Sequence, residues 1–192
     1  MPDGVEQPPI ALLIAGAGSP DHDGNDPRLT PATLKTLSEQ LMVRGIATRR
    51  YDKRGAGGWT AQFGRREDFR FKDLVDDAVV MVNHLRMAKT FAKVILVGHS
   101  EGRLVAILAA QRVPIDRLIL LATAARRQGD LLKPQLHKRA LPIGVAPMAE
   151  AIDSIMAGRI VDPLPQGLAI APAMQPSAAS AFIEDPIDPL KS

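Results

Sequence analysis

One serine in this chain has the neighbours that an enzyme nucleophile requires. Ser100 stands at the centre of Gly98-His99-Ser100-Glu101-Gly102, with an apolar run at residues 94–97 before it and a helix-like segment at residues 104–112 after it. A Gly-x-Ser-x-Gly pentapeptide between a strand and a helix forms a nucleophile elbow, whose sharp turn strains the serine backbone and exposes its hydroxyl. Glycine is needed at both ends because a Cβ would collide with the packed strand and helix. The pattern therefore predicts acyl transfer with Ser100 as the attacking group.

The segments around this serine alternate between strands and helices. Continuous apolar runs are typical of strands buried on both faces of a parallel sheet, and amphipathic spacing predicts helices. Strands are expected at residues 10–15, 46–51, 93–97 and 118–122, and helices at 31–44, 71–86 and 104–112, the first of them capped by Thr30. This order predicts an α/β fold with a mainly parallel sheet and flanking helices.

The composition changes after residue 125. Residues 128–158 are expected to be helical, with breaks at Pro134, Pro142 and Pro147, and the chain from residue 162 onward is rich in proline, alanine and serine. We therefore expect an α/β core in residues 1–125. Residues 126–192 should form a cap-like helical segment, either a lid over an acyl pocket or a cover for a sheet edge, ending in a proline-rich, poorly ordered tail.

Composition excludes several kinds of site and partner. The chain of 192 residues has no cysteine, which rules out disulfides, thiolate zinc sites and cysteine nucleophiles. Its net charge is +3 and its basic clusters are short, so solvated edges are favoured over a nucleic-acid surface. Neither a signal-peptide pattern nor a membrane-spanning apolar run is visible. We expect a soluble cytoplasmic protein with no nucleic-acid partner and no membrane span.

Three segments of the chain match a known pattern in order and spacing over residues 8–125. Residues 12–18, extended by Asp21-His22-Asp23-Gly24-Asn25, are similar to an oxyanion loop after a first central strand. Tyr51-Asp52-Lys53-Arg54-Gly55-Ala56-Gly57 is similar to an Asp-x-Arg-Gly-x-Gly turn, and the elbow is the third segment. Together they resemble the α/β-hydrolase superfamily, in particular bacterial serine-aminopeptidase-like and lysophospholipase-like hydrolases. The resemblance implies a partial α/β-hydrolase core.

The resemblance also implies a reaction. Ser100 would attack the carbonyl carbon of a small acyl ester, amide or peptide substrate, and preorganised N–H groups would meet the oxyanion that forms. The family takes one donor from the residue after the nucleophile, here Glu101, and the other from the loop after the first central strand, here Ala17. Glu101 would act through its backbone amide.

Neither a cofactor nor a metal is expected. Asp21, Asp23 and Asn25 imitate the start of a calcium loop, but aspartate stands at the position of its glycine and alanine at that of its glutamate. Gly16-x-Gly18 is not followed at the spacing of a dinucleotide-binding loop.

The chain departs from the family pattern where the acid and the base belong. In the family they follow the serine on loops after later strands, whereas here no strand is expected beyond residue 122 and no histidine follows His137. We interpret His99 as a wall residue of the pocket, and His84 and His137 as solvated or packing residues. A serine without a base is a poor nucleophile, so the sequence predicts a truncated hydrolase with severely impaired catalysis.

Two alternatives stay open beside this hypothesis. The chain could be a non-catalytic module that retains the pocket and binds an acyl or peptide ligand. It could also be a fragment of a split hydrolase that needs another chain to complete its sheet. Leu118-Ile119-Leu120-Leu121 would then lie at an exposed sheet edge, and an apolar unpaired edge favours self-association.

Overall fold

The computed structural model describes residues 1–18, 20–26, 29–57, 68–122, 126–139, 142–168, 170 and 172–184. The chain divides into two compact units. One, here called the sheet unit, comprises Met1–Phe63 and Leu74–Thr123, and the other, the helical unit, comprises Gly64–Asp73 and Ala124–Ser192. The boundary at residue 125 between a core and a cap-like segment stays a prediction.

The sheet unit is built on four parallel strands in the order β2-β1-β3-β4. Their bounds are β1 (Ile10–Ile14), β2 (Ala47–Arg50), β3 (Val94–His99) and β4 (Arg117–Leu121). Every residue of β1 is buried, because this central strand has a neighbour on each side and helices above and below. The predicted α/β fold with a parallel sheet is confirmed.

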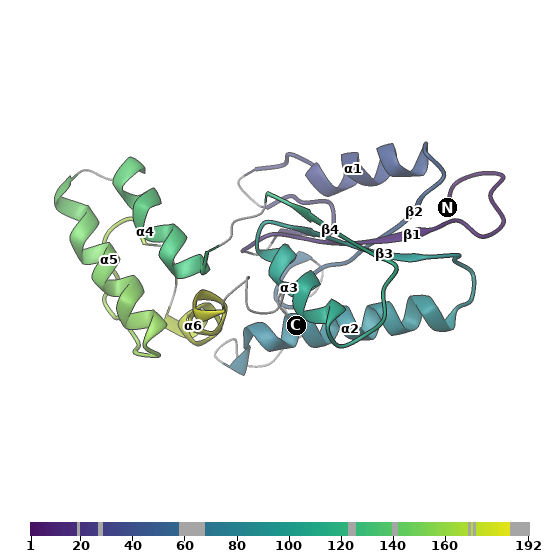
Figure 1. The fold of residues 1–192 in the computed structure, drawn as a ribbon. Coiled ribbons are helices and arrows are strands. Elements are labelled where there is room, and N and C mark those ends of the chain that lie inside the picture. Colours follow the sequence, from purple (N-terminus) through teal and green to yellow (C-terminus); the bar gives the residue numbers. More distant parts are fainter. Residues whose placement is uncertain are drawn as a thin grey trace. The chain divides into compact units, whose positions relative to one another are not determined.

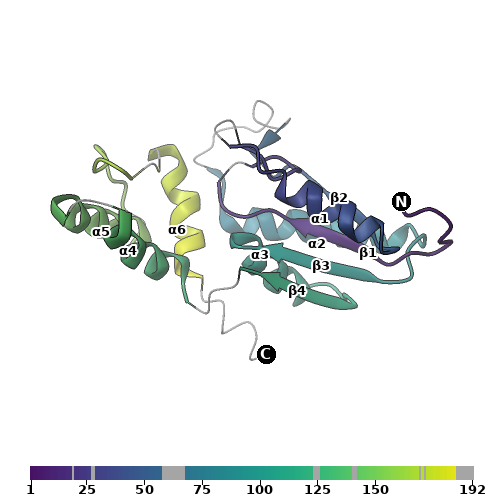
Figure 2. The ribbon, with the colours of Figure 1, turned by 90° about the horizontal axis from the view of Figure 1, so that it is seen from above.

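Helices cover both faces of the sheet. α1 (Thr33–Met42) lies on one face, and α2 (Phe71–Met87) and α3 (Glu101–Ala110) lie on the other (Figure 1). Seen from above, α1 runs along β1 and β2 (Figure 2). Right-handed crossovers explain the split, because the chain moves from β1 to β2 in one direction and from β2 past β1 to β3 and β4 in the other.

The core follows the alternation of side chains along the strands. Ala11 and Leu13 of β1, with Ile95 and Val97 of β3, pack against the leucines of α1. Because successive strand residues point to opposite faces, Leu12 and Leu96 face the other layer, and both are fully buried. The apolar runs that predicted these strands therefore bury side chains on both faces of the sheet.

The start of α1 differs from the prediction. The helix begins at Thr33, and its N-cap is Ala32 rather than Thr30, with a left-handed φ of 49°. Asn25 Oδ1 accepts a hydrogen bond from the Ala32 N–H at 2.8 Å, and Asp21 Oδ1 accepts from the N–H groups of Asp23 and Asn25. The predicted Thr30 cap is wrong, because the backbone carbonyl of Asp23 in this loop accepts from the N–H groups of Leu34 and Lys35 in the first turn.

The helical unit contains α4 (Gln128–Arg139), α5 (Pro142–Met156) and α6 (Gln175–Ile183), and each helix contacts the other two. Ile152, Ile155 and Phe182 form its buried core. α6 forms within the segment expected to be poorly ordered, while residues 185–192 lie outside the described residues. In the described part of the chain no strand follows β4.

Two of the three proline breaks predicted in this unit are wrong. Pro134 and Pro147 lie inside α4 and α5, although an interior proline costs about 3 kcal/mol or more. Both are exposed, so their rings interrupt the solvent-facing side of the helices while the packed sides persist. Pro142 does mark a boundary, since it is the first residue of α5, where a missing N–H costs nothing.

Glycines let three backbone segments meet at the centre of the sheet unit. A Cβ on Gly98 at the end of β3 would lie 2.5 Å from Arg103 Cα in α3. A Cβ on Gly102 in α3 would lie 2.6 Å from the carbonyl oxygen of Ala15, just after β1, and would also collide with the carbonyl of Ile14. α3 can therefore lie against β1 only because these positions carry no side chain.

The turn after β2 is fastened to α2 by a bidentate ion pair. Arg54 donates from Nε and Nη2 to the two carboxylate oxygens of Asp77, at 2.7 and 2.6 Å. Tyr51 begins this turn. Burial raises the pKa of the Tyr51 hydroxyl well above its ordinary value, and the negative charge of Asp77 raises it further.

We predict that Gly102→Ala lowers the free energy of unfolding by about 1 to 3 kcal/mol, because backbone atoms of β1 cannot move aside for the new methyl group. The loss should appear even though alanine favours a helix by about 1 kcal/mol over glycine. The measurement is urea denaturation followed by circular dichroism.

Gly129→Ala is the matched control, since Gly129 is likewise the second residue of its helix. The three atoms nearest to its added Cβ all belong to the flexible side chain of Met156, which can rotate away, so little or no loss is expected. Equal losses in the two variants would contradict the close contact of α3 with β1.

We predict that the Tyr51 phenol stays protonated in the folded protein at pH values where a free tyrosine, with a pKa of about 10, ionises. Because the unfolded chain then binds fewer protons, this group should lower the free energy of unfolding by about 1.4 kcal/mol per pH unit above pH ~10. Tyr51→Phe should remove that component. Tyr51 is the chain's one tyrosine, so tyrosinate absorbance reports it alone, and its appearance near the ordinary pKa in folded protein would contradict the prediction.

Candidate functional site

Ser100 has the strained backbone of a sharp strand-to-helix turn. Its φ is 53° and its ψ is −118°, a conformation that L side chains rarely adopt and that costs about 1–3 kcal/mol. Its N–H donates to the Leu121 carbonyl of β4 at 3.0 Å, and its hydroxyl makes no cap bond to α3. The serine predicted as nucleophile thus stands between β3 and α3, in the conformation that its motif predicted.

The loop after β1 lies against this turn. A Cβ on Gly16 would be 3.2 Å from Ser100 Cβ and 3.4 Å from His99 Nδ1. The chain leaves β1 and β3 toward opposite edges of the sheet, and open α/β sheets bind ligands outside the carboxyl ends of such strands. The structure therefore brings Ser100 and Glu101 together with Gly16, the residue before Ala17. The roles predicted for Ala17, Ser100 and Glu101 stay predictions.

A buried lysine joins the two segments, and the sequence interpretation did not single it out. The Lys53 side chain is 4% exposed, and its Nζ donates to the carbonyl oxygen of Gly16. The same Nζ lies 3.4 Å from Oε1 of Glu101, whose side chain is 13% exposed. The signal available in the sequence was the position of this lysine in the turn just after β2. Because the carboxyl ends of parallel strands meet at one edge of the sheet, a residue in that turn is expected near the ends of the neighbouring strands.

Arg103 supports the elbow from within α3. Its side chain is buried, and Nη1 donates to the Ser100 carbonyl at 3.0 Å. Burial lowers the pKa of the Arg103 guanidinium, and the nearby negative charge of Glu101 opposes that shift. The first turn of α3 therefore holds the main chain of Ser100 through a charged donor.

A second link ties the loop after β1 to the turn after β2. Asp52 Oδ1 accepts hydrogen bonds from both the N–H and Nδ1 of His22, at 2.6 and 2.8 Å. Nε2 of His22 lies 3.6 Å from Asp23 Oδ1, and Arg50 Nη1 donates to that same oxygen. A carboxylate on Nδ1 fixes the orientation of an imidazole ring. In the described contacts this ring pairs with aspartates and not with Ser100.

The histidines that the sequence assigned to other roles lie in different places. His99 Nδ1 is close to Gly16, and its role as a wall residue of the pocket stays a prediction. His84 is exposed on α2, in agreement with a solvated residue. The His137 side chain lies outside the described part of the structure.

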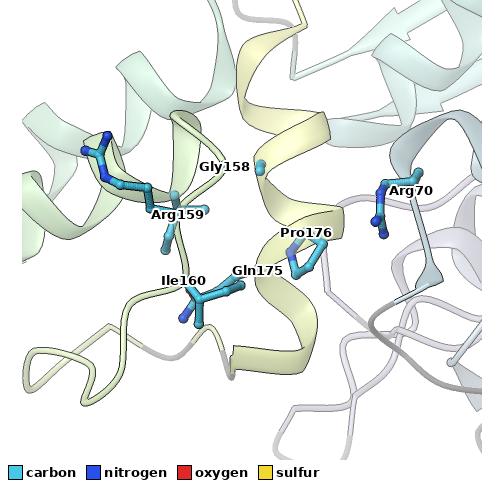
Figure 3. A pocket seen from close by; sticks show the side chains of 8 residues that line it. Arg70, Gly158, Arg159, Ile160, Gln175 and Pro176 are labelled. Carbon is cyan, nitrogen blue, oxygen red and sulfur yellow. The ribbon is translucent and has the colours of Figure 1, made fainter.

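A hollow of about 210 Å³ lies within the helical unit, and Figure 3 shows the side chains that line it. It is lined by Arg70, Ile155, Gly158, Arg159, Ile160, Gln175, Pro176 and Ala179, none of which is a nucleophile or a general base. The buried Gln175 amide already bonds the Val161 N–H and the carbonyls of Val161 and Ile170. This hollow therefore does not offer an alternative centre for acyl transfer.

Two further searches cover only the described residues. No group of three or more histidine, aspartate or glutamate side chains there is arranged to hold a metal ion. Within the same residues, no helix is both long and apolar enough to cross a lipid bilayer.

Comparison with known proteins adds evidence from outside this chain. The family of serine aminopeptidases, S33, matches residues 32–163. Esterase EstD of Thermotoga maritima is 27% identical over 161 residues, which cover 81% of this chain and 36% of the esterase. The chain thus spans about a third of the length of that curated relative.

Two solved structures share the fold. The α/β-hydrolase GrgF from a Penicillium species superimposes with a TM-score of 0.60 and 16% identity, covering 97% of this chain and 68% of the other. A lipase-esterase related protein from Clostridium acetobutylicum gives a TM-score of 0.54 at 16% identity, covering 97% and 71%. These likenesses, the family match and the strand order lead to one conclusion: the chain belongs to the serine aminopeptidase S33 family of α/β-hydrolases.

Proposed function

We propose that this chain is a serine hydrolase that cleaves a small acyl ester through Ser100. The observation that carries the proposal is the strained φ of 53° at Ser100, placed beside Gly16 at the carboxyl ends of β1 and β3. Strain of this kind concentrates at functional sites. The esterase activity of a relative supports an ester over an amide or a peptide as substrate.

The proposed reaction has two halves. Ser100 Oγ attacks the carbonyl carbon and gives up its proton, and the carbonyl oxygen becomes an oxyanion bound by the N–H groups of Ala17 and Glu101. The intermediate collapses to an acyl-serine as its bond to the alkoxide breaks, and the alkoxide takes up a proton and leaves as the alcohol. Water then attacks the acyl-serine, the bond to Oγ breaks, the carboxylic acid leaves and a proton restores the serine hydroxyl.

We further propose that turnover by these 192 residues is slow. Among the described residues, no histidine hydrogen-bonds Ser100, so the proton has no placed acceptor. A hydrolase that lacks its base retains binding and oxyanion stabilisation but loses about 10⁴- to 10⁶-fold in kcat. Covalent labelling of Ser100 by a reactive reagent should therefore be easier to observe than turnover.

We predict that a fluorophosphonate probe labels the wild-type chain and that Ser100→Ala abolishes the labelling. p-Nitrophenyl ester hydrolysis should be weak in the wild type and no faster in the variant, which keeps only the residual rate from binding and oxyanion stabilisation. Ser154→Ala is the control, because Ser154 is a helical-unit serine whose described hydrogen bond is to Arg159. A wild-type chain that is folded by circular dichroism and yet takes up no label would contradict the enzyme and favour the non-catalytic binding module.

The edge of the sheet favours a second proposal, that another chain completes it. β4 is an edge strand, and Ile119 on it is 43% exposed. An edge strand presents unpaired N–H and C=O groups, and apolar side chains on it favour pairing with another chain. A split hydrolase or a self-associating sheet would use this edge.

We predict concentration-dependent self-association that Ile119→Lys weakens, since lysine on an edge strand opposes strand pairing. Val80→Lys is the matched control, because Val80 is 64% exposed but lies on α2. The measurement is size-exclusion chromatography with light scattering. A wild-type chain that stays monomeric at every concentration tested would rule out self-association through β4.

A further inference from the structure

We propose that Lys53 is a positioning residue that orients both N–H donors of the oxyanion hole. The inference rests on the function proposed above, in which Ala17 and Glu101 supply those donors. Its basis is one ammonium group that contacts the loop after β1 and the first residue of α3 together. A lysine that is 4% exposed must keep such partners, because an unpaired buried charge is costly.

The first contact fixes a peptide plane. Lys53 Nζ donates to the carbonyl oxygen of Gly16, and that carbonyl shares a rigid, planar peptide unit with the N–H of Ala17. In a trans peptide the two bonds point in opposite directions, so a carbonyl held toward Lys53 turns the Ala17 N–H away from it. Gly16 needs such a restraint, because a glycine has wide backbone freedom.

The second contact holds the other donor and balances charge. Glu101 follows the nucleophile, and its carboxylate would repel the negative charge that develops on the substrate oxygen. Lys53 lies 3.4 Å from Oε1 of that carboxylate, so its positive charge offsets the repulsion and anchors the residue whose N–H is needed. One buried cation therefore serves two donors that lie on different elements.

Lys53→Met keeps an unbranched apolar side chain as far as the ε position and removes the ammonium group. We expect the rate of fluorophosphonate labelling at Ser100 to fall about 10- to 100-fold, since small errors in the position of reacting groups cost that much. Ester acylation should lose kcat while KM changes little, because the donors act on the transition state. Lys53→Arg should restore part of the rate by donating to the same carbonyl.

Two further variants separate positioning from folding. Lys53→Met with Glu101→Gln removes the unpaired carboxylate and should fold like the wild type while still labelling slowly. Lys133→Met breaks an ion pair with Asp153 in the helical unit and should label at the wild-type rate. A labelling rate that is unchanged in the double variant, or that falls equally in Lys133→Met, would overturn the proposal.

A readout without activity keeps this inference separate from the proposed function. In ¹⁵N-labelled protein, the backbone amide of Ala17 should shift and exchange faster in Lys53→Met, while an amide in the core of α2 stays unchanged. If the wild type fails to label, the proposed function fails, yet the Ala17 amide still tests the positioning. An Ala17 amide that is the same in both proteins would overturn it.

Discussion

The direct contact of α3 with β1 is the constraint on which the rest of the sheet unit depends. Gly102 lies so close to the carbonyls of Ile14 and Ala15 that no side chain fits, and the chain must turn from β3 into α3 within a single residue. That residue is Ser100, and its strain costs about 1–3 kcal/mol. α3 buries Leu104, Val105 and Ile107 on the sheet, each worth about 1.5–3 kcal/mol, so packing outweighs the strain. The strained conformation of Ser100 is thus a consequence of how closely a helix lies on a sheet.

Charged groups join the ends of the strands, and stability alone does not explain them. Lys53, Glu101 and Arg103 are all largely buried near Ser100, and His22 pairs with Asp52 between two neighbouring loops. Apolar residues of similar volume often serve as well as a buried ion pair, whereas removing one partner is costly. Groups of this kind do fix loop geometry, because their directional bonds tolerate few arrangements. The loops after β1 and β2 carry the atoms whose positions an oxyanion hole would depend on.

The sequence predicted what local pattern determines and missed what distant contacts determine. The apolar runs identified all four strands, and the elbow could be recognised because its glycines stand within two residues of Ser100. No local sequence pattern marks Lys53 as part of the site, since its two partners lie 37 and 48 residues away along the chain. Thr30 is a reasonable cap by residue type, but the backbone carbonyl of Asp23 in the preceding loop accepts from the N–H groups of Leu34 and Lys35 instead. Pro134 and Pro147 were expected to end helices, yet packing among α4, α5 and α6 outweighed the loss of single hydrogen bonds.

Binding an acyl group and turning it over are separable in this architecture. An oxyanion hole and a binding surface without the triad still provide about 10³- to 10⁴-fold rate enhancement over water. The groups proposed for the oxyanion hole lie in the sheet unit and are held by β1, β3 and the turn after β2. Proton transfer is a different requirement, because it needs a base within hydrogen-bond reach of Ser100 Oγ. In the proposed reaction the sheet unit would therefore polarise a carbonyl and present a nucleophile to it, while the speed would depend on the group that accepts the serine proton.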